Sequence, residues 1–77
     1  MKIHVRRRHI KKGKRSHARL CPVALAFKER AHKRRVHVSQ WYLESGAKIF
    51  DLPQSVQEFI ARFDAGKPVK PFAFVLK

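Results

Sequence analysis

Apolar and polar residues alternate in several stretches of the chain, and this alternation predicts short β-strands. Residues 1–5 and residues 69–77 alternate at the two ends of the sequence. Residues 41–50 are typical of a β-hairpin whose turn lies near residues 44–46.

Residues 34–40 alternate in the same way. On an extended chain, Val36 and Val38 face one side while Arg35 and His37 face the other. We therefore expect a strand with its valines in the core and its charged side chains at the surface.

Two stretches have the periodicity of amphipathic helices. Residues 22–33 begin with Pro22, which suits the first turn of a helix because its missing N–H needs no partner there. Residues 51–66 repeat apolar side chains at i, i+3, i+4 and i+7, and Gly66 is expected to end this helix as its C-cap. The apolar stripe of the second helix consists of Val56, Phe59, Ile60 and Phe63.

The predicted order of elements, β-(α)-α-β-β-α-β, indicates a fold of the α+β class. We expect a small antiparallel sheet of about four strands, with two or three helices on one of its faces. A chain of 77 residues has room for one domain, residues 1–77, with a small core. Residues 6–19 form a basic N-terminal arm outside this regular pattern.

Charge changes this picture because it is concentrated in one half of the chain. The formal net charge is +14, from 19 Lys and Arg against five Asp and Glu. Residues 1–38 hold fourteen of these bases and a single acid, Glu29, whereas residues 39–77 hold five bases and four acids. Such an asymmetry points to a polyanionic partner.

The arm contains eight Lys and Arg and no acid. As a helix it would place like charges four residues apart, as in Arg7 and Lys11, and each such pair costs roughly 0.2–0.5 kcal/mol. Gly13 weakens a helix further. We therefore expect residues 6–19 to be frayed until an anion binds and orders them.

Lysine and arginine neutralise phosphates and release the counterions condensed on a nucleic acid, so a dense basic segment predicts nucleic-acid binding. If about six phosphates are engaged, the affinity should fall with salt concentration with a log–log slope of roughly −5. The alternative is a solvated arm that only confers solubility, but the absence of acids argues against it. The candidate residues are Arg6, Arg7, Arg8, Lys11, Lys12, Lys14, Arg15, Arg19, Arg30, Lys33, Arg34 and Arg35.

Trp41 and Tyr42 are the candidates for base stacking. Adjacent residues of a strand face opposite ways, so one of these rings is expected at the surface. The alternative is one ring in the core and one at the edge of the hairpin. The sequence contains no RRM signature, zinc-finger spacing or clear helix-turn-helix pair, so we expect binding without sequence specificity.

Cys21 is the only thiol of the chain. With His17 it has local metal-ligand spacing, and His9, His32 or His37 would complete a zinc site, but the dense positive charge opposes a dication. Cys21 is otherwise a buried apolar group, or a thiolate whose pKa is lowered by nearby cations. Because no carboxylate pair, phosphate loop or oriented general base accompanies it, we expect no metal, no cofactor and no enzymatic activity.

A single cysteine cannot form an internal disulfide, so nothing requires an oxidising compartment. No apolar run approaches the roughly 20 residues of a membrane span, and the chain begins with a charged, alternating stretch. We expect a cytoplasmic protein with no membrane partner.

The segments CPVALAF and LPQSVQEFIARFDAGKPVKPFAFVL together resemble a group of short, uncharacterised bacteriophage and prophage proteins. That group has an N-terminal strand, a Cys-Pro-aliphatic helix and a closing Phe-Asp-x-Gly-x-x-Val-x-Pro-Phe-x-Phe segment. The resemblance implies a phage-type protein of the host bacterial cytoplasm and supplies no catalytic residue. The arm departs from the group, whose N-terminal arms are less basic. The matching residues are Cys21, Pro22, Phe63, Asp64, Gly66, Val69, Pro71, Phe72 and Phe74.

Three functions follow from these features. A binding module would hold the phosphates of DNA or RNA without sequence specificity. A phage-encoded, anti-CRISPR-like inhibitor of a host nucleoprotein complex would grip nucleic acid or an acidic protein surface, because its positive charge excludes DNA mimicry. A ribosomal or virion structural protein would insert the arm into RNA or DNA, although the nearly uncharged second half argues against this role. Binding to the nucleic-acid backbone is our leading hypothesis.

Overall fold

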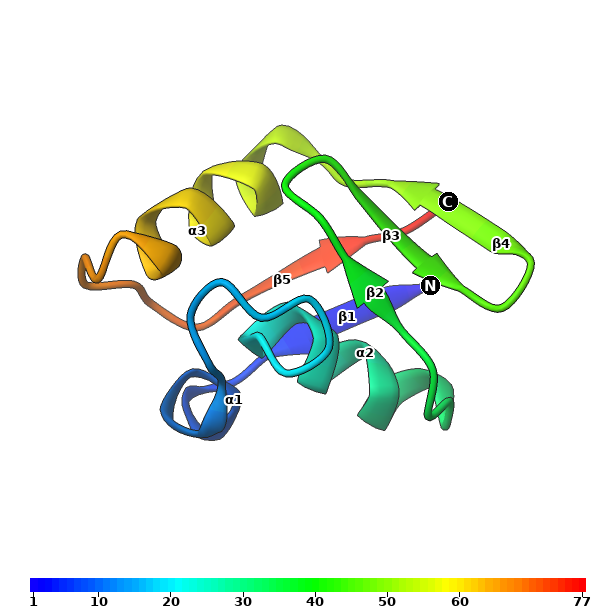
Figure 1. Ribbon diagram of the computed structural model, residues 1–77, viewed down its shortest axis with the longest axis horizontal. Helices are drawn as coiled ribbons and strands as arrows, with labels where there is room; N and C mark the ends of the chain where they lie inside the picture. Colours follow the sequence, from blue (N-terminus) through cyan, green and yellow to red (C-terminus); the bar gives the residue numbers. More distant parts are fainter.

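The computed structural model describes all 77 residues. The chain forms five strands and three helices, which confirms the predicted α+β class (Figure 1). The elements are β1 (Lys2–Val5), α1 (Arg7–Lys12), α2 (Pro22–Ala31), β2 (His37–Val38), β3 (Tyr42–Ser45), β4 (Lys48–Asp51), α3 (Gln54–Asp64) and β5 (Phe72–Val75).

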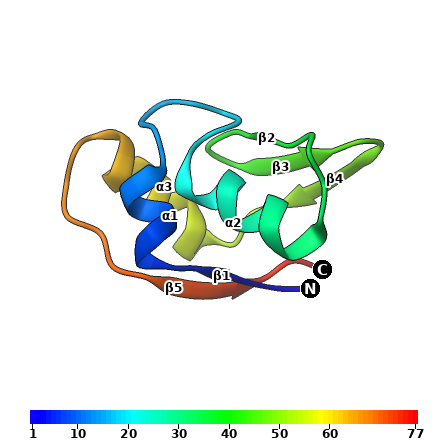
Figure 2. The same cartoon turned by 90° about the horizontal axis from the view of Figure 1, so that it is seen from below.

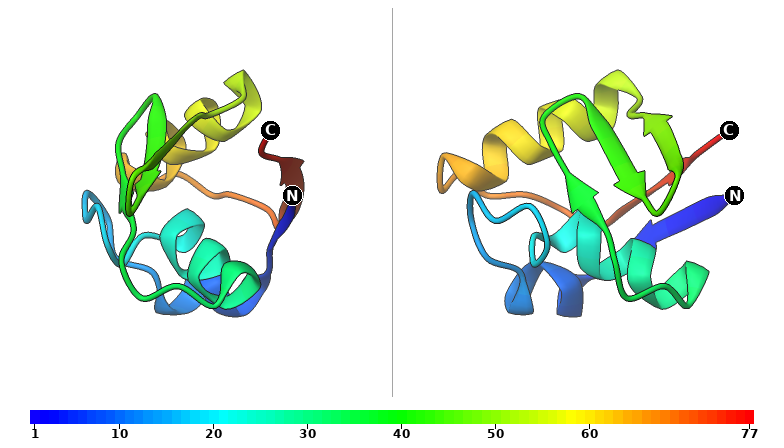
Figure 3. Two further views of the ribbon diagram at one scale, coloured as in Figure 1. Left: turned by 90° about the vertical axis from the view of Figure 1, so that its right-hand side faces the viewer. Right: turned by 45° about the vertical axis from the view of Figure 1, so that its right-hand side comes forward.

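The strands form two antiparallel sheets, where the sequence predicted one sheet of about four strands. β1 pairs with β5, so the two ends of the chain lie side by side, with Ile3 opposite Phe74. β2, β3 and β4 form the second sheet in chain order. The left view of Figure 3 shows the sheets on opposite sides of the molecule, with α2 below and α3 above. The helices thus lie between two sheets and not on one face of a single sheet.

One hydrophobic core fills the space between these layers. Ile3 of β1, Leu43 of β3 and Val56 of α3 have no exposed surface, and Phe27 of α2 is 2% exposed. The whole apolar stripe predicted for α3 is buried, as expected. The ring of Phe72 in β5 packs against the ring of Phe59 in α3, and their centroids are 4.7 Å apart. The nearly neutral second half of the chain therefore supplies much of the scaffold.

β3 and β4 form the predicted hairpin, with the turn at residues 46–47. Gly46 has a φ of 61°, a left-handed conformation that glycine adopts without steric cost. Glycine at the first position of a two-residue turn is typical of type II′, whose twist matches that of the flanking strands.

α2 begins at Pro22, as the sequence predicted. Before it, the thiol of Cys21 caps the helix by accepting a hydrogen bond from the backbone N–H of Ala24 at 3.4 Å. After it, His32 adopts a left-handed φ of 55° and turns the chain away from the helix axis. This turn directs residues 33–36, which carry three cations, toward β2.

Residues 7–12 of the arm form helix α1, where the repulsion between like charges predicted a frayed segment. α1 lies beside α2 at one end of the molecule (Figure 2). Ile10 packs against the core, and Gly13, which ends the helix, lies against Pro22. A Cβ atom at Gly13 would come within 2.6 Å of the Pro22 ring. Close packing on α2 thus supports a helix that its own charges oppose.

We expect Gly13→Ala to lower the free energy of unfolding by about 1–3 kcal/mol, because the added methyl group overpacks the contact with Pro22. Urea unfolding followed by circular dichroism measures this loss. Gly46→Ala is the control: its Cβ meets nothing within 4 Å, so only the left-handed backbone opposes it. Unchanged stability in Gly13→Ala would show that α1 does not pack closely on α2.

Candidate nucleic-acid interface

A buried histidine attaches α1 to α2. His9 is 5% exposed, and its Nδ1 accepts a hydrogen bond from the backbone N–H of Arg6 at 2.9 Å. Because a backbone N–H can only donate, Nδ1 carries no proton and the ring is held as the Nε2–H tautomer. Nε2 lies 2.9 Å from Oε2 of Glu29 and donates to it. A neutral imidazole therefore links the start of α1 to a carboxylate of α2.

Glu29, the only acid of the first half, is occupied by this contact. Arg8 donates to its other carboxylate oxygen. The hydrogen bond from His9, and then the one from Arg8, lower the pKa of Glu29 from its ordinary value. The carboxylate stays ionised at neutral pH while it holds α1 in place, so it does not neutralise the other cations of the arm.

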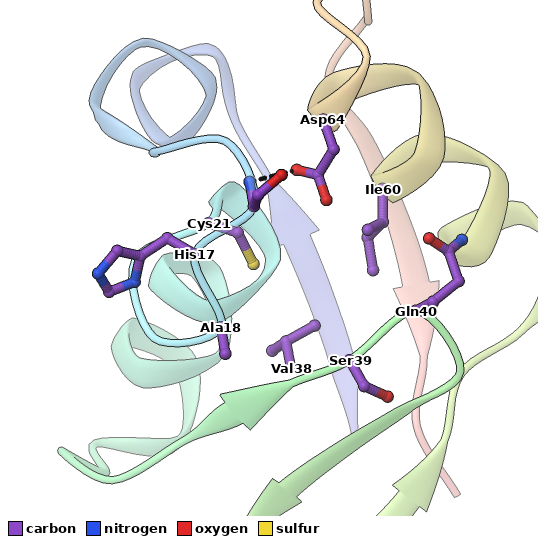
Figure 4. Close-up of a pocket in the computed structure, with 9 residues that line it drawn as sticks. His17, Ala18, Cys21, Val38, Ser39, Gln40, Ile60 and Asp64 are labelled. Carbon is purple, nitrogen blue, oxygen red and sulfur yellow. Dashed lines mark hydrogen bonds between the residues drawn. The ribbon is translucent and has the colours of Figure 1, made fainter.

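The loop of residues 13–21 ties the arm to α3 as well. The backbone N–H of Ser16 donates to Oδ1 of Asp64 at 2.8 Å (dashed line in Figure 4). The guanidinium of Arg15 lies beside the backbone of Gly66, just beyond the C-terminal end of α3. The negative end of the α3 dipole favours a cation at this position. The arm therefore contacts both helices of the scaffold.

All twelve predicted phosphate-binding residues are exposed. Only Arg8 forms an ion pair, and the other eleven have no carboxylate within ion-pair distance. Their segments are α1, the loop after it, the end of α2 and the connection from α2 to β2. In Figure 1, α1, α2 and that connection lie along the lower side of the molecule, which Figure 2 views from below. We call the exposed surface of these four segments together the basic face; it consists of Arg6, Arg7, Arg8, Lys11, Lys12, Lys14, Arg15, Arg19, Arg30, Lys33, Arg34 and Arg35.

Two hollows on the basic face gather cations from segments that are distant in the sequence. The smaller, of about 270 Å³, lies between β1 and the end of α2. The larger, of about 530 Å³, lies where the loop after α1 meets the connection from α2 to β2. The titratable residues of the smaller hollow are His4, Arg6, Glu29, Arg30 and His32. Those of the larger are Arg19, Arg34, Arg35, His37 and Glu44.

Two residues of the larger hollow were not among the predicted phosphate-binding residues: His37, which the sequence suggested only as a zinc ligand, and Glu44. The alternation in residues 34–40 places His37 on the same side as Arg35, so its signal is present in the sequence. Glu44 reaches the hollow because β2 pairs with β3 in a register that sets it opposite His37. No single stretch of sequence contains that register.

The structure does not bring the candidate stacking residues to the basic face. Trp41 is 66% exposed and Tyr42 is partly buried, so one ring is at the surface, as expected. Trp41 belongs to the connection between β2 and β3. In Figure 1 this connection lies on the opposite side of the molecule from α1 and α2. Trp41 therefore lies apart from the cations of α1.

Cys21 lines a separate cavity of about 240 Å³ (Figure 4). Burial is the largest cause that raises the pKa of its thiol, so the pKa lowering by cations considered from the sequence is not found. Nδ1 of His17 accepts hydrogen bonds from the backbone N–H groups of Arg19 and Leu20, and the ring points away from Cys21. The two side chains therefore form neither a ligand pair nor a nucleophile–base pair. No group of three His, Cys, Asp or Glu side chains is placed to hold a metal ion.

None of the helices is both long and apolar enough to cross a membrane. No model of a protein family, no curated protein and no solved structure matches the chain. The resemblance to phage proteins thus stays a prediction, and function must be argued from the basic face itself.

We expect the carboxyl group of Glu29 to titrate below the ordinary glutamate pKa of about 4.3, because His9 and Arg8 stabilise its ionised form. The contribution of this contact to stability is present above that ordinary value and is lost as pH falls through the lowered pKa. Carbon-13 NMR of the Glu29 carboxyl in the folded chain and in urea measures the shift. In Glu29→Gln, amide exchange within α1 should become faster at neutral pH. Identical titration in both states would rule out this role.

We expect Cys21 to be a slow nucleophile, because burial raises the pKa of its thiol and excludes reagents. In Ellman's assay at neutral pH, the folded chain should react at least ~100-fold more slowly than the chain unfolded in urea, since reaction requires local opening. Rapid reaction of the folded protein would instead mark Cys21 as an accessible thiolate.

Proposed function

We propose that this protein binds the phosphate backbone of DNA or RNA, without sequence specificity, through its basic face. The observation that carries the proposal is the unpaired charge on this face: eleven exposed cations have no carboxylate partner. Nucleic acid offers phosphates at a matching density, and releasing their counterions drives binding.

Repulsion within α1 supports the same proposal. The helix has like charges four residues apart in two pairs, Arg7 with Lys11 and Arg8 with Lys12. Each pair opposes the helix by roughly 0.2–0.5 kcal/mol, and phosphates beside it would remove that cost. Binding of a polyanion should therefore also stabilise the fold, because a ligand of the folded state shifts the unfolding equilibrium.

The short length of α1 favours contacts to phosphates over the reading of bases. Reading a sequence requires an element that reaches base edges over several base pairs. Six residues of helix span about 9 Å, less than the rise of three base pairs. Its four exposed side chains are all Lys or Arg, which suit the backbone of any sequence.

The proposal is of a binding module and not of an enzyme. The thiol of Cys21 is buried and its pKa is raised. Nδ1 of His17 already accepts hydrogen bonds from backbone N–H groups of its own turn. The cations of the basic face can hold a phosphate, but no paired nucleophile and base lies beside them.

Binding should be measurable by fluorescence anisotropy with a labelled 20-nucleotide duplex, its single strand and an RNA of the same sequence. We expect the log–log dependence of affinity on salt to have a slope of about −5, and the affinity to be nearly the same for scrambled sequences. Replacing Arg7, Lys11 and Lys12 together with Gln should weaken binding about tenfold and flatten the slope. Binding that does not respond to salt would exclude a phosphate interface.

The matched control replaces Arg62, Lys67 and Lys77 with Gln. This variant loses the same net charge from the second half of the chain, so it should bind almost as the wild type does. Equal weakening in both triple variants would mean that net charge alone governs binding and would refute an interface on the basic face.

A pull-down from bacterial lysate, with and without nuclease, identifies the physiological partner. Free nucleic acid is expected to be captured without nuclease and lost with it. Capture of one protein complex that survives nuclease would instead indicate an acidic protein surface, the partner expected of an anti-CRISPR-like inhibitor.

A further inference from the structure

The larger hollow of the basic face is assembled from three connections. Arg19 comes from the loop between α1 and α2, Arg34 and Arg35 from the connection between α2 and β2, and Gly46 from the turn between β3 and β4. Val36 is its only apolar lining residue. The hollow of about 530 Å³ is therefore lined mainly by charged and polar residues and is open to a charged ligand.

Hydrogen bonds hold the backbone on the Arg19 side of the hollow. The N–H of Arg19 donates to Nδ1 of His17 at 3.3 Å, within a tight turn. The carbonyl of Ala18 accepts a hydrogen bond from the N–H of Val38 at 2.9 Å, which ties this turn to β2. Arg19 is thus brought beside residues 34–37 by a tertiary contact.

The opposite side of the hollow is held by β3. The hydroxyl of Ser45 donates to the carbonyl of Arg35 at 2.9 Å. One residue earlier, Glu44 lies opposite His37 in the ladder between β3 and β2. The arginine side chains on both sides therefore project from a backbone that is already in position before a ligand binds.

The charge of the hollow is not balanced within the protein. Three arginines and one glutamate, Glu44, are among its lining residues, which gives a net charge of +2 when histidine is counted as neutral. No carboxylate lies within ion-pair distance of any of these arginines. Guanidinium groups bind the oxygens of phosphate in pairs, and several of them surround one phosphate better than a lysine does.

We propose that this hollow, which we call the arginine cleft (Arg19, Arg34 and Arg35), binds a single phosphate group and is the primary anchor for nucleic acid on the basic face. The inference rests on the proposed function and specifies which part of the basic face is the primary anchor. The cations of α1 contact further phosphates beyond this anchor. Because Val36 is the only apolar residue of the cleft and no Phe, Tyr or Trp ring lines it, the cleft recognises the phosphate and not the attached base.

The first test compares two variants that each remove three charges from the basic face. One replaces Arg19, Arg34 and Arg35 with Gln, and the other replaces three cations of α1 in the same way. We expect the cleft variant to lose about 100-fold in affinity for the 20-nucleotide probe, against about tenfold for the α1 variant at the same salt. Circular dichroism of each variant establishes that it is folded.

A gain in affinity provides a test that misfolding cannot imitate. Glu44→Gln removes the one negative charge of the cleft with little change in size, so it should bind the probe several-fold more tightly. Glu58→Gln is the matched control, because it makes the same change on the exposed side of α3. Unchanged affinity in Glu44→Gln would count against the cleft.

Inorganic phosphate and pyrophosphate, titrated into the wild-type protein, test the site without nucleic acid. NMR signals of the side-chain Nε–H groups of Arg19, Arg34 and Arg35 should shift at millimolar ligand, before those of Arg7. Probes with and without a 5′-phosphate then distinguish a strand end from an internal phosphodiester as the group bound.

The outcomes separate this inference from the function on which it rests. Equal losses in the cleft and α1 variants, both larger than in the control from the second half of the chain, would overturn the cleft and leave the basic face intact. Losses that are equal in all three triple variants would overturn the proposed function itself.

Discussion

The attachment of α1 to the rest of the molecule depends on one carboxylate. Glu29 is bonded to His9 and to Arg8, and it is the only acid in a half of the chain with fourteen Lys and Arg. Because the imidazole of His9 is neutral, its burial brings no unpaired positive charge into the interior. The packing of Ile10 and Gly13 on the scaffold supplies the apolar part of the same attachment. The arm is a helix because these contacts outweigh its own repulsion.

A basic arm that is held in place by tertiary contacts differs physically from a disordered basic tail. A disordered segment must give up conformational entropy when it binds, and this ordering reduces its affinity. In this protein, hydrogen bonds from Ser16 to Asp64 and from Val38 to Ala18 already hold the loop after α1. Its cations are therefore presented at defined places, which is a condition for a site such as the arginine cleft.

The two halves of this very small protein differ in net charge and in the core elements that they supply. A chain of this length has a small core, so each buried side chain contributes a large share of the stability. The second half supplies the stripe of α3, the hairpin and the aromatic contact between Phe59 and Phe72. Since that half carries almost no net charge, it packs without repulsion and leaves the cations of the first half at the surface. Both halves contribute to the core, whereas the excess positive charge lies in the first half alone.

Local periodicity by itself determined a large part of this structure. The stripe of α3, the start of α2 at Pro22, the inward valines of residues 34–40 and the β3–β4 hairpin were all predictable, because each depends on residues a few positions apart. The position of the exposed cations was predictable for the same reason, because Ile10 is the only large apolar side chain of the arm.

Only the tertiary structure decided which of these segments meet. Periodicity shows which face of a strand is apolar but not which strand lies beside it, so the division into two sheets was not predictable. The bond from His9 to Glu29, the burial that raises the pKa of Cys21 and the separation of Trp41 from the basic face all depend on contacts between distant segments. The arginine cleft is the clearest case, because Arg19 and Arg35 become neighbours only when the loop after α1 bonds to β2.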